Sequence, residues 1–180
     1  MLFETKRLKI RRFTIEDAPA VLEFNSNQEV IAQTGDRLIS TISDAEDIIN
    51  NIWLPEYEKY GYARMAVVLK KEKKVIGFSG LKFETEINTT DIGYRFLPQY
   101  WGKGIATESA LPFIFYGFKV LKLPKIVGLA FSDNKASCKV LENLGLKFKK
   151  DGNFFDDGNH YNWYELEREE YQSVSQSRKS

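Results

Sequence analysis

The segment 91–110, DIGYRFLPQYWGKGIATESA, contains residues whose types and spacing suit a chemical site. Gly102 and Gly104 flank Lys103 immediately before a run with helical spacing. Glycines at the N-terminus of a helix let a ligand approach the backbone closely. The unpaired N–H groups of that terminus favour an anion, most often phosphate. The sequence therefore predicts a phosphate-bearing ligand at residues 99–107.

Two familiar phosphate-binding loops do not fit this segment. A P-loop requires Gly-Lys followed by Ser or Thr, whereas Lys103 is followed by Gly104. A dinucleotide fingerprint requires a third glycine at the position of Thr107. The pattern Gln99-x-x-Gly102-x-Gly104 instead resembles the (Arg/Gln)-x-x-Gly-x-(Gly/Ala) signature of the GNAT superfamily, the acyl-CoA-dependent N-acetyltransferases.

Two further segments resemble the RimJ/RimL-like branch of this superfamily. Residues 5–18, TKRLKIRRFTIEDA, resemble the opening T-x-R-L-x-L-R-x-(F/L)-T-x-x-D-A, and residues 134–146 resemble the block N-x-x-S-x-x-(V/L)-x-E-x-L-G-F. The resemblance covers roughly residues 5–168. It implies a mixed α/β GNAT fold with helices on both faces of a central twisted, mostly antiparallel sheet of about seven strands. The sheet is splayed between its fourth and fifth strands, and acetyl-CoA, the co-substrate, lies in the gap.

The resemblance also implies which residues bind acyl-CoA. Backbone amides of the glycine turn would meet the pyrophosphate, the strand edge before Pro98 would pair with the pantetheine arm, and Asn134 would hold that arm from the opposite side. The expected acyl-CoA-binding residues are Phe96, Leu97, Gln99, Tyr100, Trp101, Gly102, Lys103, Gly104, Ile105, Ala106, Thr107, Asn134 and Ser137.

The reaction is attack of a neutral amine on a thioester, and it requires protonation of the leaving thiolate. Many GNAT enzymes carry a tyrosine where this chain has Leu141, so we predict that Ser137, one turn earlier, is nearest the leaving sulfur. A helix-interior serine that bonds the preceding turn is the alternative. Asp91 stands where many relatives carry a glutamate base, and Asp156 and His160 lie in a loop that could face the acceptor. For each of these three, a surface or packing role is the alternative.

The sequence also indicates which class of amine is the preferred acceptor. Because no strong base is visible, we expect an α-amine, whose reference pKa is about 8, in preference to lysine at about 10.4. A protein N-terminus is one such acceptor; small molecules such as polyamines, aminoglycosides or amino acids remain open. A non-catalytic acyl-CoA sensor on the same fold is an alternative of another class.

Hydrophobic periodicity predicts the elements that position these residues. We expect strands at 5–13, 64–69, 74–83, 91–96, 125–131, 146–150 and 160–167. We expect helices after an N-cap at Thr14, at 27–32, from a Ser43–Glu46 capping box to about 60, at 104–121 with a kink at Pro112, and at 135–144. Residues 1–171 would form one domain and 172–180 a flexible tail. Trp53, Tyr57 and Tyr60 are expected to pack in the core rather than line the acceptor site.

Composition narrows the function classes. The 26 Lys and Arg against 25 Asp and Glu give a net charge of +1, which argues against a dedicated nucleic-acid binder; the alternative would use the lysines of 70–74 and 147–150. One cysteine, Cys138, and one histidine predict neither a disulfide nor a metal site. No signal peptide or spanning segment is apparent, so we expect a cytoplasmic monomer or homodimer without membrane partners.

Overall fold

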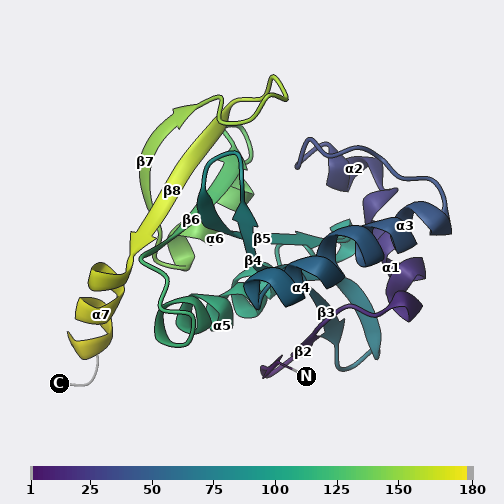
Figure 1. Ribbon diagram of the computed structural model, residues 1–180, viewed down its shortest axis with the longest axis horizontal. Helices are drawn as coiled ribbons and strands as arrows, with labels where there is room; N and C mark the ends of the chain where they lie inside the picture. Colours follow the sequence, from purple (N-terminus) through teal and green to yellow (C-terminus); the bar gives the residue numbers. More distant parts are fainter. Residues whose placement is uncertain (1, 178–180) are drawn as a thin grey trace.

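The computed structural model describes residues 2–177, which build one eight-stranded sheet flanked by helices (Figure 1). The strand order is β1-β2-β3-β4-β5-β6-β8-β7. The strands are β1 (Phe3–Glu4), β2 (Leu8–Arg11), β3 (Met65–Leu69), β4 (Lys74–Glu84), β5 (Thr89–Phe96), β6 (Lys125–Phe131), β7 (Lys147–Gly152) and β8 (Tyr161–Glu167). The helices are η1 (Ile15–Asp17), α1 (Ala18–Asn25), α2 (Gln28–Ile31), α3 (Ile42–Ile48), η2 (Ile49–Trp53), α4 (Leu54–Tyr60), η3 (Pro98–Tyr100), α5 (Ile105–Lys119), α6 (Lys135–Asn143) and α7 (Arg168–Ser177).

The sheet is split between β5 and β6. Every other neighbouring pair is antiparallel, whereas β5 and β6 run parallel and share the single register pair Asp91–Val127 among the described residues. Beyond Asp91 the β6-facing edge of β5 has no strand partner in the described chain. This confirms the predicted GNAT fold and its splay; the strand count is one higher than expected because Phe3–Glu4 pairs with β2.

Helices cover both faces of the sheet. The side chains of β4 alternate between these two faces and contact helices on each. Phe78 meets Phe24 of α1 and Trp53 of η2 on one face, with ring centroids 5.9 Å apart in both pairs. Leu81 points to the other face, where Gly117 of α5 packs closely enough that a Cβ there would lie 3.3 Å from Leu81. Helix α6 covers β6 on that second face, and a Cβ at Gly128 would be 2.4 Å from Leu141.

The helix before β3 begins earlier than the sequence predicted. Its capping box joins Thr41 and Asp44, with the Thr41 hydroxyl accepting from the Asp44 amide at 3.1 Å, so the Ser43–Glu46 prediction was wrong. Both pairs satisfy the same spacing rule, and the two-residue difference moves the start by half a turn. Pro55 is the second residue of α4, and the π-helical segment η2 ends immediately before that helix.

Three other predictions concern helix boundaries. The capping box of Thr14 and Asp17 is present, although the first turn it caps is the 3-10 helix η1. Helix α5 continues through Pro112, as expected of a kinked rather than a broken helix. Helix α7 extends to Ser177, through the first part of the predicted tail; residues 178–180 lie outside the described residues.

Trp53 and Tyr57 are buried in the core and the partly buried Tyr60 packs against it, as the sequence predicted. Trp53 stacks on Phe13 at 4.2 Å between centroids, and the Tyr57 hydroxyl donates to the Arg64 carbonyl at 2.6 Å. In the part of the chain that the structure describes, no helix is both long and apolar enough to cross a bilayer.

Candidate active site

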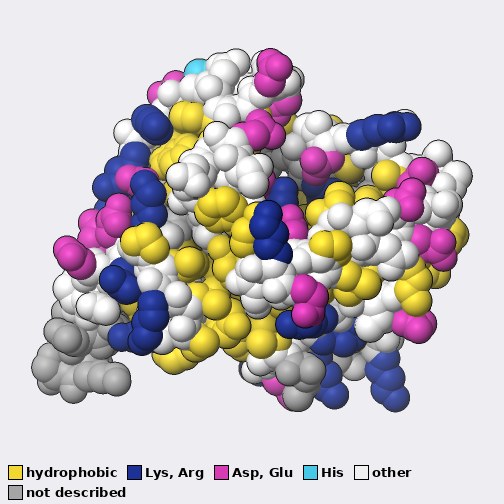
Figure 2. All heavy atoms as spheres, viewed as in Figure 1, with side chains coloured by type: hydrophobic (Ala, Val, Ile, Leu, Met, Phe, Trp, Pro, Cys, Tyr) yellow, Lys and Arg dark blue, Asp and Glu magenta, His cyan; other side chains and the backbone are white. Residues whose placement is uncertain are grey.

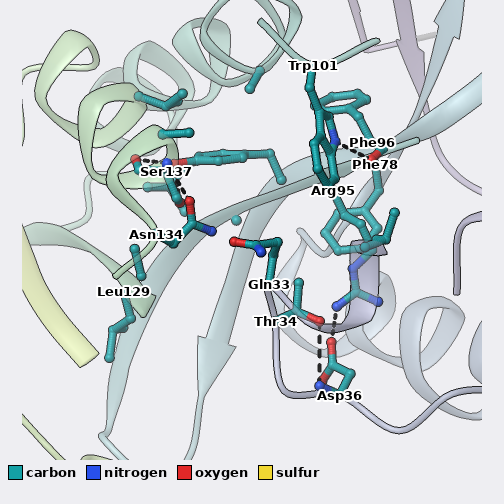
Figure 3. A pocket seen from close by; sticks show the side chains of 18 of the residues that line it. Gln33, Thr34, Asp36, Phe78, Arg95, Phe96, Trp101, Leu129, Asn134 and Ser137 are labelled. Carbon is teal, nitrogen blue, oxygen red and sulfur yellow. Dashed lines mark hydrogen bonds and ion pairs between the residues drawn. The ribbon is translucent and has the colours of Figure 1, made fainter. Parts of the chain in front are cut away.

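A cleft of about 350 Å³ occupies the split in the sheet (Figure 3). One wall is β5 from Asp91 to Phe96, and the other is formed by Leu129 and Ala130 of β6 with the N-terminal half of α6. Residues of the segment that follows α2, among them Thr34 and Asp36, close one end of the cleft (Figure 3). Trp101 and Gly102 of the glycine turn also line it. The cleft is therefore a direct consequence of the divergence of β5 and β6.

The glycine turn precedes α5 in the predicted position. Gly102 and Gly104 have φ of 68° and 71°, in the left-handed region that glycine adopts without strain. Gly104 is the N-cap residue of α5, so the first-turn amides of a 15-residue helix begin here. The Trp101 indole donates to the Phe96 carbonyl at 2.7 Å, which fixes the turn to the end of β5. This arrangement suits an anionic ligand.

Ser137 faces the cleft from α6 and contacts Tyr94 of β5. The Tyr94 hydroxyl lies 3.0 Å from both the carbonyl oxygen and the Oγ of Ser137. Among the described residues the Ser137 hydroxyl therefore bonds across the split and not to the preceding turn. Burial raises the pKa of Tyr94 well above its ordinary value, so the phenol keeps its proton. Asn134 caps α6, and its Oδ1 accepts from the Ser137 amide at 3.0 Å (Figure 3).

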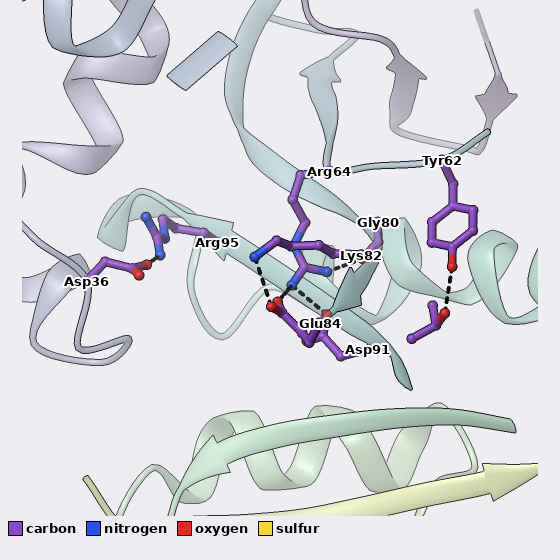
Figure 4. Close-up of polar contacts among 9 residues, drawn as sticks. Asp36, Tyr62, Arg64, Gly80, Lys82, Glu84, Asp91 and Arg95 are labelled. Carbon is purple, nitrogen blue, oxygen red and sulfur yellow. Dashed lines mark hydrogen bonds and ion pairs between the residues drawn. The ribbon is translucent and has the colours of Figure 1, made fainter. Parts of the chain in front are cut away.

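Asp91 is buried at the narrow end of the cleft, which rules out the surface alternative. Its Oδ1 accepts from Arg64 Nη2 at 2.7 Å, and Arg64 Nη1 donates to the Gly80 carbonyl at 2.6 Å (Figure 4). Lys82 and Glu84 form an ion pair of 2.9 Å beside them. Desolvation raises the pKa of Asp91 to about 6, with Glu84 adding to the rise and Arg64 opposing it.

Gly93 leaves the space that the Arg64 guanidinium occupies. A Cβ at Gly93 would lie 2.5 Å from the guanidinium carbon of Arg64, closer than a contact tolerates. Gly93 belongs to β5, whereas Arg64 immediately precedes β3, on the other side of β4. The position of the Arg64–Asp91 pair therefore depends on a residue that has no side chain.

A second cavity of about 480 Å³ continues from the cleft and shares Thr34, Asp36, Asp91 and Leu129 with it. Six carboxylate residues line it, against Arg37 and Lys82: Asp36, Glu84, Glu86, Asp91, Asp156 and Asp157. Figure 2 shows the surface hollowed between the β7–β8 hairpin and the α2–α3 segment, with charged side chains around the opening. This end of the cleft suits a cationic group.

Arg95 joins the wall of the cleft to the segment after α2. Its guanidinium donates to Asp36 and to Asn25. The guanidinium carbon also lies over the Phe78 ring, 5.1 Å from the ring centroid (Figure 3). Its side chain is 9% exposed, and desolvation lowers its pKa to about 10. The arginine remains charged near neutral pH, so the Asp36 contact is an ion pair.

The predicted acyl-CoA residues divide into three groups. Those that line the cleft are Phe96, Trp101, Gly102, Ala106, Asn134 and Ser137. The side chains of Leu97, Tyr100 and Ile105 are buried in the core instead. Gln99, Lys103 and Gly104 are exposed and Thr107 is half-buried; none of the four lines the cleft.

Two loop residues of the sequence analysis have different positions. Asp156 lines the second cavity. His160 lines neither cavity; it contacts Asp151 at 2.7 Å and Asn153 at 3.1 Å on the exposed side of its loop.

Sequence reasoning missed Arg64, Tyr94, Arg95 and Asp36. The available signal was the presence of arginine beside or within apolar strands, since a charged residue there needs a buried partner. Which carboxylate serves as the partner follows from strand pairing and not from spacing in the sequence.

Comparison with known proteins agrees with this geometry. Residues 7–147 match the family described as an acetyltransferase (GNAT) domain. The uncharacterized N-acetyltransferase YoaA of Bacillus subtilis is 32% identical over 152 residues, which are 84% of each chain. The chain belongs to the GNAT family of acetyltransferases, whose members use acetyl-CoA.

Solved structures show the same fold. A GNAT-family acetyltransferase from Bacillus anthracis has a TM-score of 0.79 at 27% identity, covering 94% of this chain and 99% of that one. A ribosomal-protein-S5-alanine acetyltransferase from Vibrio fischeri has 0.77 at 21%, covering 94% and 97%. A spermidine N-acetyltransferase from Vibrio cholerae, solved with CoA and spermine, has 0.76 at 18%, covering 93% and 99%. The last two are similar in fold alone.

Proposed function

We propose that this chain transfers the acetyl group of acetyl-CoA to a primary amine within the split of the sheet. The observation that carries the proposal is the single cleft that joins the glycine turn, the unpaired edge of β5 and two candidate proton-transfer groups, Asp91 and Ser137. The donor would lie with its phosphates at the turn and its thioester near Ser137 and Tyr94. The amine would arrive from the acidic cavity.

Each polar group then has a distinct task. Asp91, ionised above a pKa of about 6, accepts a proton from the attacking amine. Ser137 donates a hydrogen bond to the developing thiolate, and the Tyr94 hydroxyl at 3.0 Å holds the serine Oγ in place. Asn134 retains its capping bond and presents its remaining amide group to the cleft. The chemistry requires no metal ion.

For the acceptor we propose a protein N-terminal α-amine, as in the RimJ/RimL-like branch. An α-amine has a reference pKa of about 8 and is partly neutral at physiological pH, so a carboxylate of modest basicity suffices. The fold of the ribosomal-protein-S5-alanine acetyltransferase supports the proposal. A polyamine is the second candidate, because six carboxylate residues line the second cavity. The fold similarity to a spermidine N-acetyltransferase points the same way.

Release of CoA from acetyl-CoA tests both proposals. We would compare a peptide with a free N-terminus, an N-terminally blocked peptide that contains lysine, and spermidine. Faster turnover of the free peptide is expected. Preference for the blocked peptide would contradict the α-amine proposal, and preference for spermidine would replace it by the second candidate. CoA binding without turnover of any amine would instead identify a sensor module.

Nucleic acid is a poor partner for this surface. The lysines of the β3–β4 turn and those of β7 lie on strands that β5, β6 and β8 separate in the sheet, so they do not form one patch. Lys70, Lys74 and Lys147 are paired with Glu4, Glu23 and Glu170.

A further inference from the structure

The opening segment of the chain contacts the start of α5, which follows the glycine turn, although the two are about a hundred positions apart in the sequence. Glu108, in the first turn of α5, accepts three hydrogen bonds from residues 5–7. The donors are Thr5 Oγ1 at 2.6 Å, the Arg7 amide at 2.9 Å and Arg7 Nε at 2.6 Å. The two motifs that appeared independent in the sequence therefore form one contact.

Arg7 extends this contact to the turn itself. While its Nε binds Glu108, its Nη1 donates to the carbonyl oxygen of Lys103 at 2.8 Å. Lys103 lies between the two glycines of left-handed conformation, a residue type whose backbone has a wide choice of conformations. One guanidinium thus connects a helix end to the middle of the turn.

We infer that Arg7 is a positioning residue that holds the glycine turn in the conformation that binds the phosphates of CoA. Binding the Lys103 carbonyl fixes the orientation of the peptide group that precedes Gly104, so the amides of the turn are aimed before the ligand arrives. Preorganised donors bind an anion more tightly than donors that must first be ordered. This inference rests on the proposed function, because it assumes that acyl-CoA occupies the turn.

The surroundings of Arg7 indicate that it acts through the geometry of its hydrogen bonds rather than through its charge. The Arg7 side chain is 40% exposed and Glu108 is 20% exposed, so solvent weakens the ion pair as a source of stability. Desolvation of Glu108 is outweighed by the bonds from Thr5 and Arg7, which lower its pKa and keep it ionised. Thr5 is fixed in turn, since its Oγ1 accepts from the Leu8 amide at 3.1 Å. The planar fork of an arginine spans two separated acceptors at once, whereas the compact ammonium of a lysine matches this spacing poorly.

Arg12 offers a matched control. It is also an exposed arginine in an ion pair, with Glu58 at 3.0 Å, and it is five positions further along the chain from Arg7. In the described chain its side chain contacts Glu58 and Tyr57 of α4, and not the glycine turn. Loss of Arg12 removes a similar charge without touching the glycine turn.

The experiment measures the affinity of CoA and of pantetheine, which lacks the phosphates, by calorimetric titration and displacement. In Arg7→Ala we expect roughly tenfold weaker CoA binding, the loss typical of hydrogen bonds from a charged group. The affinity for pantetheine should change by about twofold or less, as should CoA affinity in Arg12→Ala. Arg7→Lys should not restore CoA affinity. Glu108→Gln, which keeps the shape of the side chain, should weaken CoA binding in the same direction.

Each other outcome overturns the inference in a recognisable way. Equal CoA affinity in Arg7→Ala and Arg12→Ala would show that the turn needs no support from Arg7. Equal losses for CoA and pantetheine would indicate general destabilisation, and full rescue by Arg7→Lys would show that charge alone matters. Absence of CoA binding by the wild-type chain would remove the proposed function itself. Thermal unfolding of each variant verifies that it is folded.

Discussion

The pH dependence of turnover tests whether Asp91 is the proton acceptor. Its pKa is raised to about 6, first by desolvation and then by the neighbouring Glu84. A raised acid pKa means that the carboxyl is protonated, and inactive as a base, below about pH 6 and ionised above it. About 90% is ionised at pH 7 and about 10% at pH 5, so kcat should fall about tenfold over this interval.

The assay is the rate of CoA release at saturating acetyl-CoA and acceptor from about pH 5 to pH 8, because kcat reports groups in the enzyme–substrate complex. Asp91→Asn should lower kcat at pH 7 by about 10²–10⁴-fold. It should also remove the acidic limb of the pH profile, which is the fall of kcat between pH 7 and pH 5. Glu84→Gln should move the limb to lower pH, since the like charge of Glu84 raises the pKa of Asp91. Asp47→Asn, an exposed carboxylate on α3, is the control for loss of one negative charge.

Two results would refute this reasoning. An acidic limb that persists unchanged in Asp91→Asn would belong to another group. A wild-type kcat that is flat from about pH 5 to pH 7 would show that Asp91 serves only as the partner of Arg64 at 2.7 Å.

Three further substitutions test other parts of the site. Ser137→Ala should lower kcat at least about tenfold with little change in CoA affinity, while Cys138→Ala should hardly affect kcat; equal effects would remove Ser137 from the mechanism. Gly104→Val should abolish tight CoA binding in a calorimetric titration, because φ of 71° strains a β-branched residue; wild-type affinity in a folded variant would contradict this. Gly93→Ala should destabilise the fold by about 1–3 kcal/mol in chemical denaturation by displacing Arg64, and unchanged stability would show that the guanidinium relocates freely.

Local patterns predicted the scaffold well. The run KIVGLAF is short, apolar and bounded by Pro124 and Ser132, and it forms β6 over 125–131 as expected. The helix start before β3 was harder, because Thr41–Asp44 and Ser43–Glu46 are overlapping pairs with the same capping spacing. Only the packed helix shows which pair is used.

The candidate site was predicted in part, and the missing part is long-range. The motifs placed Asn134 immediately before α6 and Ser137 within it, and both line the cleft. The pairing of Arg64 with Asp91 joins residues 27 positions apart through the strand order β3-β4-β5. The shift of the Asp91 pKa arises from burial between strands, which no residue spacing encodes.

The order of residues along β5 explains why one strand can serve donor and acceptor together. Asp91 is at the position where β5 still pairs with β6, so it lies at the apex of the split. Three residues on, the gap is wide enough for the Tyr94 side chain to reach α6. Phe96 follows and leads directly to the glycine turn. At about 3.3 Å per residue, Asp91 and Phe96 are separated by about 17 Å. The proposed proton acceptor, the proposed thiolate-binding pair and the proposed anion site therefore follow one another along the cleft in the order in which an amine, a thioester and a pyrophosphate would need them.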